Sequence, residues 1–174
     1  LEKFFGNLNC KIFKAEKINT HGGSIRVYIS KNNSVAKNLS VQKLLDEEEK
    51  FGLKNVATYY DFGKKIELLK KKVNKNILNL KKKYPDIIGY GSPAKATTAL
   101  NYFNISEEIK YIIEDNKLKH GKFVPGVNIP IKSKKEIPNN LNCVLVLAWN
   151  FFNEIKKNNK NLSNNFISIK DLEN

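Results

Sequence analysis

Residues 86–100, DIIGYGSPAKATTAL, decide the fold of this chain. An apolar run at 87–88 enters a glycine turn, and the residues from Ala94 onward favour a helix. The turn at 89–94 fits the pattern G-x-G-x-x-(G or A). In that pattern the glycines allow a tight turn and a close backbone approach to phosphate, and the small last residue lets the helix pack on the strand. The stretch therefore predicts the strand, turn and helix start of a nucleotide-binding α/β unit.

Four side chains near the turn extend this hypothesis. Ser92 can cap the helix, and Lys95 lies in its first turn, where a cation opposes the helix dipole unless it faces a phosphate. The strand-like run 109–113 delivers Glu114 and Asp115 about where a ribose-binding acid belongs. A plain strand-to-helix turn with incidental glycines is the alternative interpretation.

Strand-like and helical patterns alternate across the second half of the chain. Residues 109–113, 144–150 and 166–169 read as strands, and 94–103 and 151–157 read as helices, with a glycine- and proline-marked loop at 120–131. This alternation predicts βαβ units in a parallel sheet flanked by helices. We expect residues 84–174 to form a Rossmann-like nucleotide-binding unit of the α/β class.

The first half of the chain has a different pattern. Residues 10–18 and 24–30 read as two strands joined by a Gly-Gly turn, which predicts a β-hairpin. A short helix is expected at 41–51, and a long helix at 55–83, where apolar residues recur at spacings of three and four. Residues 1–83 are thus expected to be a hairpin and helical lead-in, which together with 84–174 makes one C-terminal domain of a larger enzyme.

The composition limits the class of partner. The net charge is +14, but 30 of the 31 basic residues are lysines, with Arg26 the single arginine. Base-reading proteins rely on arginine forks, so we expect a solvated lysine surface and no specific nucleic-acid partner. No apolar run approaches the roughly 20 residues that cross a bilayer, and no secretion signal is visible, so we expect a cytoplasmic protein without a membrane partner.

The cysteine, histidine and methionine content gives two further expectations. Two cysteines and two histidines at distant positions do not have the spacing of a metal site. The sequence also contains no methionine, so we expect a piece of a longer polypeptide.

Three further segments carry candidate functional residues. His21, in the glycine turn at 20–26, is a side chain suited to proton transfer near neutral pH, although a hairpin turn also favours Gly-Gly. Lys119 begins a basic, glycine-containing loop after a strand, where α/β folds bind ligands, and a solvent loop is the alternative. Trp149 follows a strand, where it can form a ligand wall or pack in the core.

These segments, in this order, resemble the C-terminal domain of S-adenosylmethionine-dependent C-methyltransferases that act on nucleotide-activated deoxysugars. The resemblance rests on HGGSIR at 21–26, GYGSPAK at 89–95, an acidic strand end followed by K-x-G-x-x-x-P-G at 119–126, and VLVLAWN at 144–150. Ser92 departs from the small apolar residue that many members have there.

The resemblance implies a substrate-binding domain of a sugar C-methyltransferase. Its partners would be a nucleotide diphosphate-sugar and an upstream methyltransferase domain that binds S-adenosylmethionine, and no cofactor is expected in this piece alone. The resemblance implies a catalytic role for His21 and substrate binding by Arg26, Gly89, Gly91, Ser92, Lys95, Glu114, Lys119 and Trp149. An NAD-dependent oxidoreductase domain and a basic nucleic-acid-binding module remain the alternatives.

Overall fold

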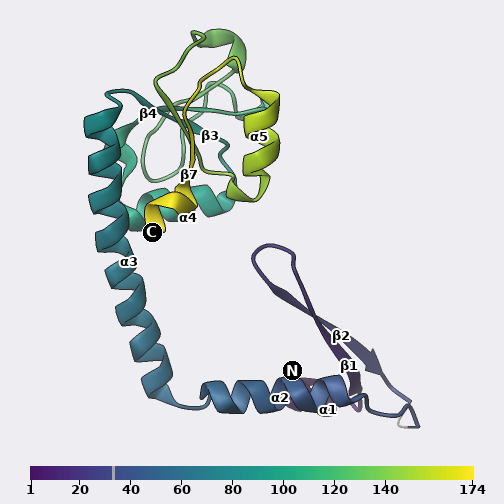
Figure 1. Cartoon of the computed structure of the whole chain (residues 1–174). Helices are drawn as coiled ribbons and strands as arrows, with labels where there is room; N and C mark the ends of the chain where they lie inside the picture. The colour runs from purple at the N-terminus through teal and green to yellow at the C-terminus, as the bar shows by residue number, and fades with distance from the viewer. Residues whose placement is uncertain (33) are drawn as a thin grey trace. The chain divides into compact units, whose positions relative to one another are not determined.

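The computed structural model describes residues 1–32 and 34–174. The chain divides into two compact units, Leu1–Lys64 and Lys65–Asn174. Helix α3 (Val56–Lys83) begins in the first unit and continues into the second (Figure 1). The sequence pattern assigned the whole of this helix to the lead-in segment. Its second half instead belongs with the sheet, because Val73 and Ile77 are buried in the core of the second unit.

The first unit contains the hairpin that the sequence predicted. Strands β1 (Lys11–Ile18) and β2 (Ser24–Ser30) pair antiparallel. One face of the hairpin packs on helix α2 (Leu39–Phe51), where Ile12, Ala15 and Val41 are buried together. A short helix, α1 (Glu2–Gly6), precedes the hairpin and was not expected.

The second unit is built on a five-stranded parallel sheet, which confirms the predicted α/β class. The strand order is β5-β4-β3-β6-β7, and every neighbouring pair is parallel. The strands are β3 (Ile87–Tyr90), β4 (Ile109–Ile113), β5 (Ile131–Lys132), β6 (Cys143–Val146) and β7 (Phe166–Ser168).

Two details of the sheet differ from the sequence prediction. The short strand β5 forms at the end of the segment expected to be only a loop. Strand β6 ends at Val146, and a 3-10 helix, η4 (Trp149–Phe151), takes the place of the expected strand end. The chain therefore turns away from the sheet before Trp149.

Helices cover both faces of the sheet, so alternate strand residues enter two separate apolar clusters. Ile87 and Leu145 pack toward helix α4 (Ala94–Phe103), the second half of α3 and the C-terminal 3-10 helix η5 (Ile169–Glu173). Ile88 and Val144 pack toward helix α5 (Phe152–Asn158) on the other face (Figure 1). Three more 3-10 helices lie in the connections: η1 (Ser106–Glu108), η2 (Lys117–Lys119) and η3 (Lys134–Glu136).

The strand order reverses between β3 and β6. From β3 the chain continues to β4 and β5 on one side, and then crosses to β6 and β7 on the other. Open parallel sheets bind ligands in the crevice that such a reversal leaves at the carboxyl ends of the strands. The loops after β3, β4, β5 and β6 are therefore placed around one point.

The longest helix, α3, is lysine-rich rather than uniformly apolar. Within residues 1–32 and 34–174, no helix has the length and hydrophobicity needed to cross a bilayer.

Candidate functional site

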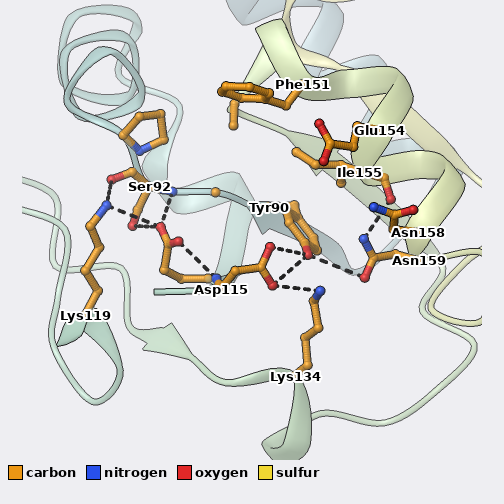
Figure 2. Close-up of a pocket in the computed structure, with 14 residues that line it drawn as sticks. Tyr90, Ser92, Asp115, Lys119, Lys134, Phe151, Glu154, Ile155, Asn158 and Asn159 are labelled. Atoms are coloured by element: carbon orange, nitrogen blue, oxygen red, sulfur yellow. Dashed lines mark hydrogen bonds and ion pairs between the residues drawn. The ribbon is translucent and has the colours of Figure 1, made fainter. Parts of the chain in front are cut away.

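A cavity of about 360 Å³ lies at the carboxyl ends of the sheet, where the strand order reverses (Figure 2). We call it the switch-point cavity. Residues from four segments of the chain line it: Tyr90 to Pro93 at the end of β3 and beyond, Glu114, Asp115 and Lys119 between β4 and β5, Lys134 after β5, and Ala148, Phe151, Glu154, Ile155, Asn158 and Asn159 after β6. Gly91, Ser92, Glu114 and Lys119 are the predicted site residues that it brings together.

Both glycines of the turn are required by the protein's own packing. Gly91 has a φ of +83°, its amide donates to the carbonyl of Ile113 (2.8 Å), and a Cβ there would lie 2.7 Å from the Cβ of Ala148. A Cβ on Gly89 would lie 2.8 Å from Cγ1 of Ile112, in the apolar cluster on the α3 and α4 side of the sheet rather than in the cavity. The glycines thus allow close contact between the turn and the adjacent strands, whether or not a ligand is bound.

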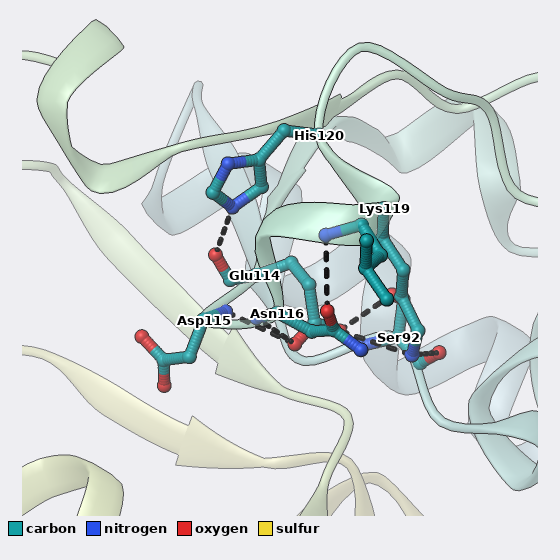
Figure 3. A network of polar contacts seen from close by, with 7 residues as sticks. Ser92, Glu114, Asp115, Asn116, Lys119 and His120 are labelled. Atoms are coloured by element: carbon teal, nitrogen blue, oxygen red, sulfur yellow. Dashed lines mark hydrogen bonds and ion pairs between the residues drawn. The ribbon is translucent and has the colours of Figure 1, made fainter.

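The backbone amide of Ser92, in the glycine turn, donates a hydrogen bond to a carboxylate of the chain itself (Figure 3). Oε2 of Glu114 accepts hydrogen bonds from the backbone N–H of Ser92 (2.9 Å) and from its hydroxyl (2.6 Å). Ser92 therefore does not cap α4: the N-cap residue is Pro93, which offers no side-chain acceptor. The backbone donor expected for a phosphate already has an anionic partner.

Further donors hold the Glu114 carboxylate in its ionised form. Oε1 accepts from the backbone N–H groups of Asp115 (3.0 Å) and Asn116 (3.1 Å), and Nζ of Lys119 lies 3.4 Å from Oε2. Burial alone would raise the pKa of Glu114, but the hydrogen bonds from Ser92 and Asn116 and the charge of Lys119 lower it to about 2.

Lys119 and His120 fasten the next loop to this carboxylate network. Nζ of Lys119 donates to the carbonyl of Ser92 (2.8 Å), and Nε2 of His120 lies 2.8 Å from the carbonyl oxygen of Glu114 (Figure 3). A second, more apolar cavity of about 450 Å³ adjoins Ser92 and Lys119 on the side of Thr97, Phe123 and Pro125. Lys119 therefore borders two cavities.

A second polar network forms the floor of the switch-point cavity. The buried Tyr90 donates its hydroxyl to both carboxylate oxygens of Asp115 (3.1 and 3.0 Å), and Nζ of Lys134 lies 2.7 Å from Oδ1 of Asp115 (Figure 2). Burial raises the pKa of Tyr90, which keeps the phenol protonated as a donor. Burial opposes the charge on Lys134, but its contacts with Asp115 and Tyr90 raise its pKa overall.

Sequence reasoning did not assign Tyr90, Lys134, Phe151 or Glu154 to the site. The sequence placed Asp115 beside Glu114 at the same strand end, although only Glu114 was named as a substrate-binding residue. Lys134 follows β5, a strand of two residues with no periodic signal, so nothing in its local sequence placed it at the sheet edge.

Lys95 and Trp149 do not line the switch-point cavity. Nζ of Lys95 lies 4.2 Å from the centroid of the Trp149 ring, and Nζ of Lys170 lies 5.6 Å from the same centroid. Trp149 packs against the apolar cluster on the α3 and α4 side of the sheet. Burial lowers the pKa of Lys95, and the nearby charge of Lys170 lowers it further. These two predicted site residues thus contact each other, on the α4 side of the glycine turn.

His21 and Arg26 belong to the first unit. His21 lies in the turn between β1 and β2 with a φ of +53°, and its side chain is exposed. Arg26 is also exposed and lies opposite Glu16 in the hairpin register. Their roles as catalytic and substrate-binding residues stay predictions.

The described residues hold no group of three or more His, Cys, Asp or Glu side chains that could bind a metal ion. The side chains that line the switch-point cavity offer hydrogen-bond donors, ionised carboxylates and an aromatic surface.

Strand order, glycine turn and acidic strand end define the second unit as a Rossmann-like α/β unit. The chain as a whole belongs to the C-methyltransferase C-terminal domain family, which matches residues 19–168. This finding confirms the family that the sequence motifs indicated.

The chain is also similar to a protein that is named as a C-methyltransferase. The chain is 27% identical over 166 residues to the C-methyltransferase NovU of Streptomyces niveus. The alignment covers 92% of this chain and 39% of that protein, so the chain spans about two-fifths of the length of the relative.

Proposed function

We propose that this chain is the substrate-binding domain of a C-methyltransferase that uses S-adenosylmethionine, and that its acceptor is a nucleotide-activated keto-deoxysugar. The observation that carries the proposal is the switch-point cavity itself. In a member of the C-methyltransferase C-terminal domain family, it combines two lysines with carboxylates and an aromatic wall at the ligand-binding edge of a parallel sheet.

The lysines favour the diphosphate of such a ligand. Lys119 and Lys134 both line the cavity, and each is about one-third exposed, so each can donate to a phosphate while keeping its carboxylate partner. The amide of Ser92 is held by Glu114, so we place the diphosphate toward the two ammonium groups rather than on that amide. The sugar nucleotide then lies across the cavity, from Lys119 and Lys134 toward α5.

The hydrogen bonds of Glu114 also affect whether the glycine turn can bind the methyl donor. In a Rossmann-like unit, the acid at the end of the second strand is the group that would accept hydrogen bonds from the ribose of an adenosyl cofactor. Both oxygens of Glu114 already accept hydrogen bonds from the chain, so this turn does not fit S-adenosylmethionine in that mode. We propose that a separate methyltransferase domain of the same enzyme binds the methyl donor.

Calorimetric titration tests this function. UDP-glucose, dTDP-glucose, S-adenosylmethionine, NAD and a DNA duplex are titrated into the chain. We expect binding of a nucleotide diphosphate-sugar, with little binding of the other three ligands. Selective binding of NAD would support an oxidoreductase domain instead, and tight, strongly salt-dependent binding of the duplex would support a nucleic-acid-binding module.

Lys134 and Lys135 are neighbours in the chain, so their substitutions make a matched test and control for the site. Lys134 pairs with Asp115 in the cavity, whereas Lys135 follows it in the same 3-10 helix, is exposed and does not line the cavity. Lys134→Ala should weaken sugar-nucleotide binding about tenfold, because a charge-assisted hydrogen bond to phosphate is lost. Lys135→Ala should leave the affinity unchanged. Equal effects of the two substitutions would mean that only the overall positive charge attracts the ligand.

A further inference from the structure

The wall of the switch-point cavity that comes from η4 and α5 has a chemistry of its own. Phe151 ends η4, and Glu154 lies in the first turn of α5. Figure 2 shows both side chains along one wall of the cavity, with Asp115 and Lys134 across from them. Phe151 is 58% exposed, whereas its neighbour Phe152 packs against the apolar core. The Phe151 ring is therefore available on the cavity surface.

Glu154 differs from the other two carboxylates of the cavity. Glu114 is held by Ser92 and Lys119, and Asp115 is held by Tyr90 and Lys134. Within the part of the chain that the structure describes, the Glu154 side chain makes no hydrogen bond or ion pair, although the net charge is +14. Its acceptor oxygens are therefore available to a bound molecule.

An aromatic ring beside a free carboxylate suits a hexose. A carboxylate only accepts hydrogen bonds, so it pairs with hydroxyl groups, and a ring face packs against the C–H groups of a pyranose. The same carboxylate repels phosphate, which agrees with a diphosphate held at Lys119 and Lys134 on the other side. A sugar nucleotide that spans the cavity thus places its hexose at Phe151 and Glu154.

We propose that Phe151 and Glu154 form the hexose subsite of this domain and select an uncharged sugar ring over a hexuronic acid. The inference rests on the function proposed above. It adds where the sugar lies and why an uncharged sugar is preferred. Glu154 accepts hydrogen bonds from the hexose hydroxyls, and its negative charge disfavours a carboxylate on the same ring.

The test compares three ligands that differ only beyond the diphosphate: UDP, UDP-glucose and UDP-glucuronic acid. Affinities are measured by calorimetry with the chain, with Glu154→Gln and Phe151→Leu, and with Glu107→Gln as the charge-matched control. Glu107 is exposed and lies in η1, at the amino end of β4, whereas the cavity lies at the carboxyl ends of the strands.

The expected pattern has three parts. The unaltered chain binds UDP-glucose about tenfold more tightly than UDP-glucuronic acid, because two like charges meet at short range. Glu154→Gln reduces that preference to about twofold or less and leaves the affinity for UDP unchanged. Phe151→Leu weakens UDP-glucose about fivefold, again without an effect on UDP, and Glu107→Gln changes none of the three affinities.

Each contrary result has one meaning. If the unaltered chain binds UDP and UDP-glucose equally, or if Glu154→Gln and Phe151→Leu weaken UDP itself, the hexose does not lie at this wall and the subsite is refuted, while the proposed function stands. If none of the three ligands binds, the proposed function fails and the subsite fails with it.

Discussion

Ser92 donates two hydrogen bonds, from its backbone N–H and from its hydroxyl, to the same carboxylate oxygen of Glu114. The contact joins the end of the first strand of the second unit to the end of the next strand along the chain. It binds the glycine turn to a carboxylate of the chain itself. Nζ of Lys119 donates to the carbonyl of Ser92, which joins the Lys119 loop to the same turn.

This contact predicts a pH-dependent contribution to stability. The pKa of Glu114 is lowered from 4.5 to about 2 in the folded chain, so its stabilising effect is complete above pH 4.5 and is lost as the pH falls toward 2. The shift corresponds to about 3 kcal/mol of unfolding free energy at neutral pH. Glu114→Gln should lose that amount at pH 7, and urea unfolding of the two proteins should converge near pH 2.

Glu107→Gln is the control for this measurement, since Glu107 is exposed and lies at the amino end of β4, whereas Glu114 follows the carboxyl end of that strand. A constant difference between the Glu114→Gln variant and the unaltered chain from pH 7 to pH 2 would contradict the assigned role of the ionised carboxylate.

Because Gly91 packs closely against Ala148, we expect a single added methyl group at position 91 to lower the stability strongly. Gly91→Ala places a Cβ 2.7 Å from that of Ala148 at a φ of +83°, so it should cost about 3 kcal/mol or more of unfolding free energy. Gly22→Ala is matched in backbone conformation, with a φ of +91° and no atom within 4 Å, and should cost about 1 kcal/mol. Thermal unfolding by circular dichroism measures both.

The double variant Gly91→Ala with Ala148→Gly separates the clash from the backbone strain. It should recover part of the loss, because it removes the methyl group that the new Cβ meets. No recovery would mean that the φ angle alone accounts for the cost.

We expect a smaller loss of stability when the hydroxyl of Tyr90 is removed. Tyr90→Phe keeps the buried ring but removes the hydroxyl that donates to Asp115, so the unfolding free energy should fall by about 1 kcal/mol. Tyr60→Phe, on an exposed ring of α3, is the control. Denaturant midpoints at constant slope provide the comparison, and equal midpoints for both variants would show that the Asp115 contact adds nothing.

Lys95 remains a predicted phosphate contact. Its position beside Trp149 allows a substitution there to be followed by tryptophan fluorescence. Its ammonium group lies over the ring of Trp149, which is the single tryptophan of the chain. Lys95→Ala should therefore shift the intrinsic tryptophan emission, and a loss of sugar-nucleotide affinity would support the phosphate contact. A changed emission with unchanged affinity would remove Lys95 from the site and leave it as a partner of Trp149.

Much of the fold could be predicted from local sequence because its signals are periodic. The alternation in 24–30, the spacing in the long helix and the glycine turn at 89–94 each depend on neighbours along the chain. The predicted hairpin, long helix and parallel sheet are therefore found in the structure. The two-residue strand β5 and the early end of β6 lack such a pattern, since sheet pairing and the turn at Ala148 decide them.

The sequence by itself determined the family, the sheet class and the turn that carries Gly91 and Ser92, because each depends on residue types at fixed spacing. The tertiary structure alone decided which side chains share the cavity. Only the parallel sheet, with its reversal between β3 and β6, places Lys134 against Asp115 and puts Glu154 across from them, because these residues come from separate segments of the sequence. The same packing turned Lys95 toward Trp149 and gave the amide of Ser92 to Glu114.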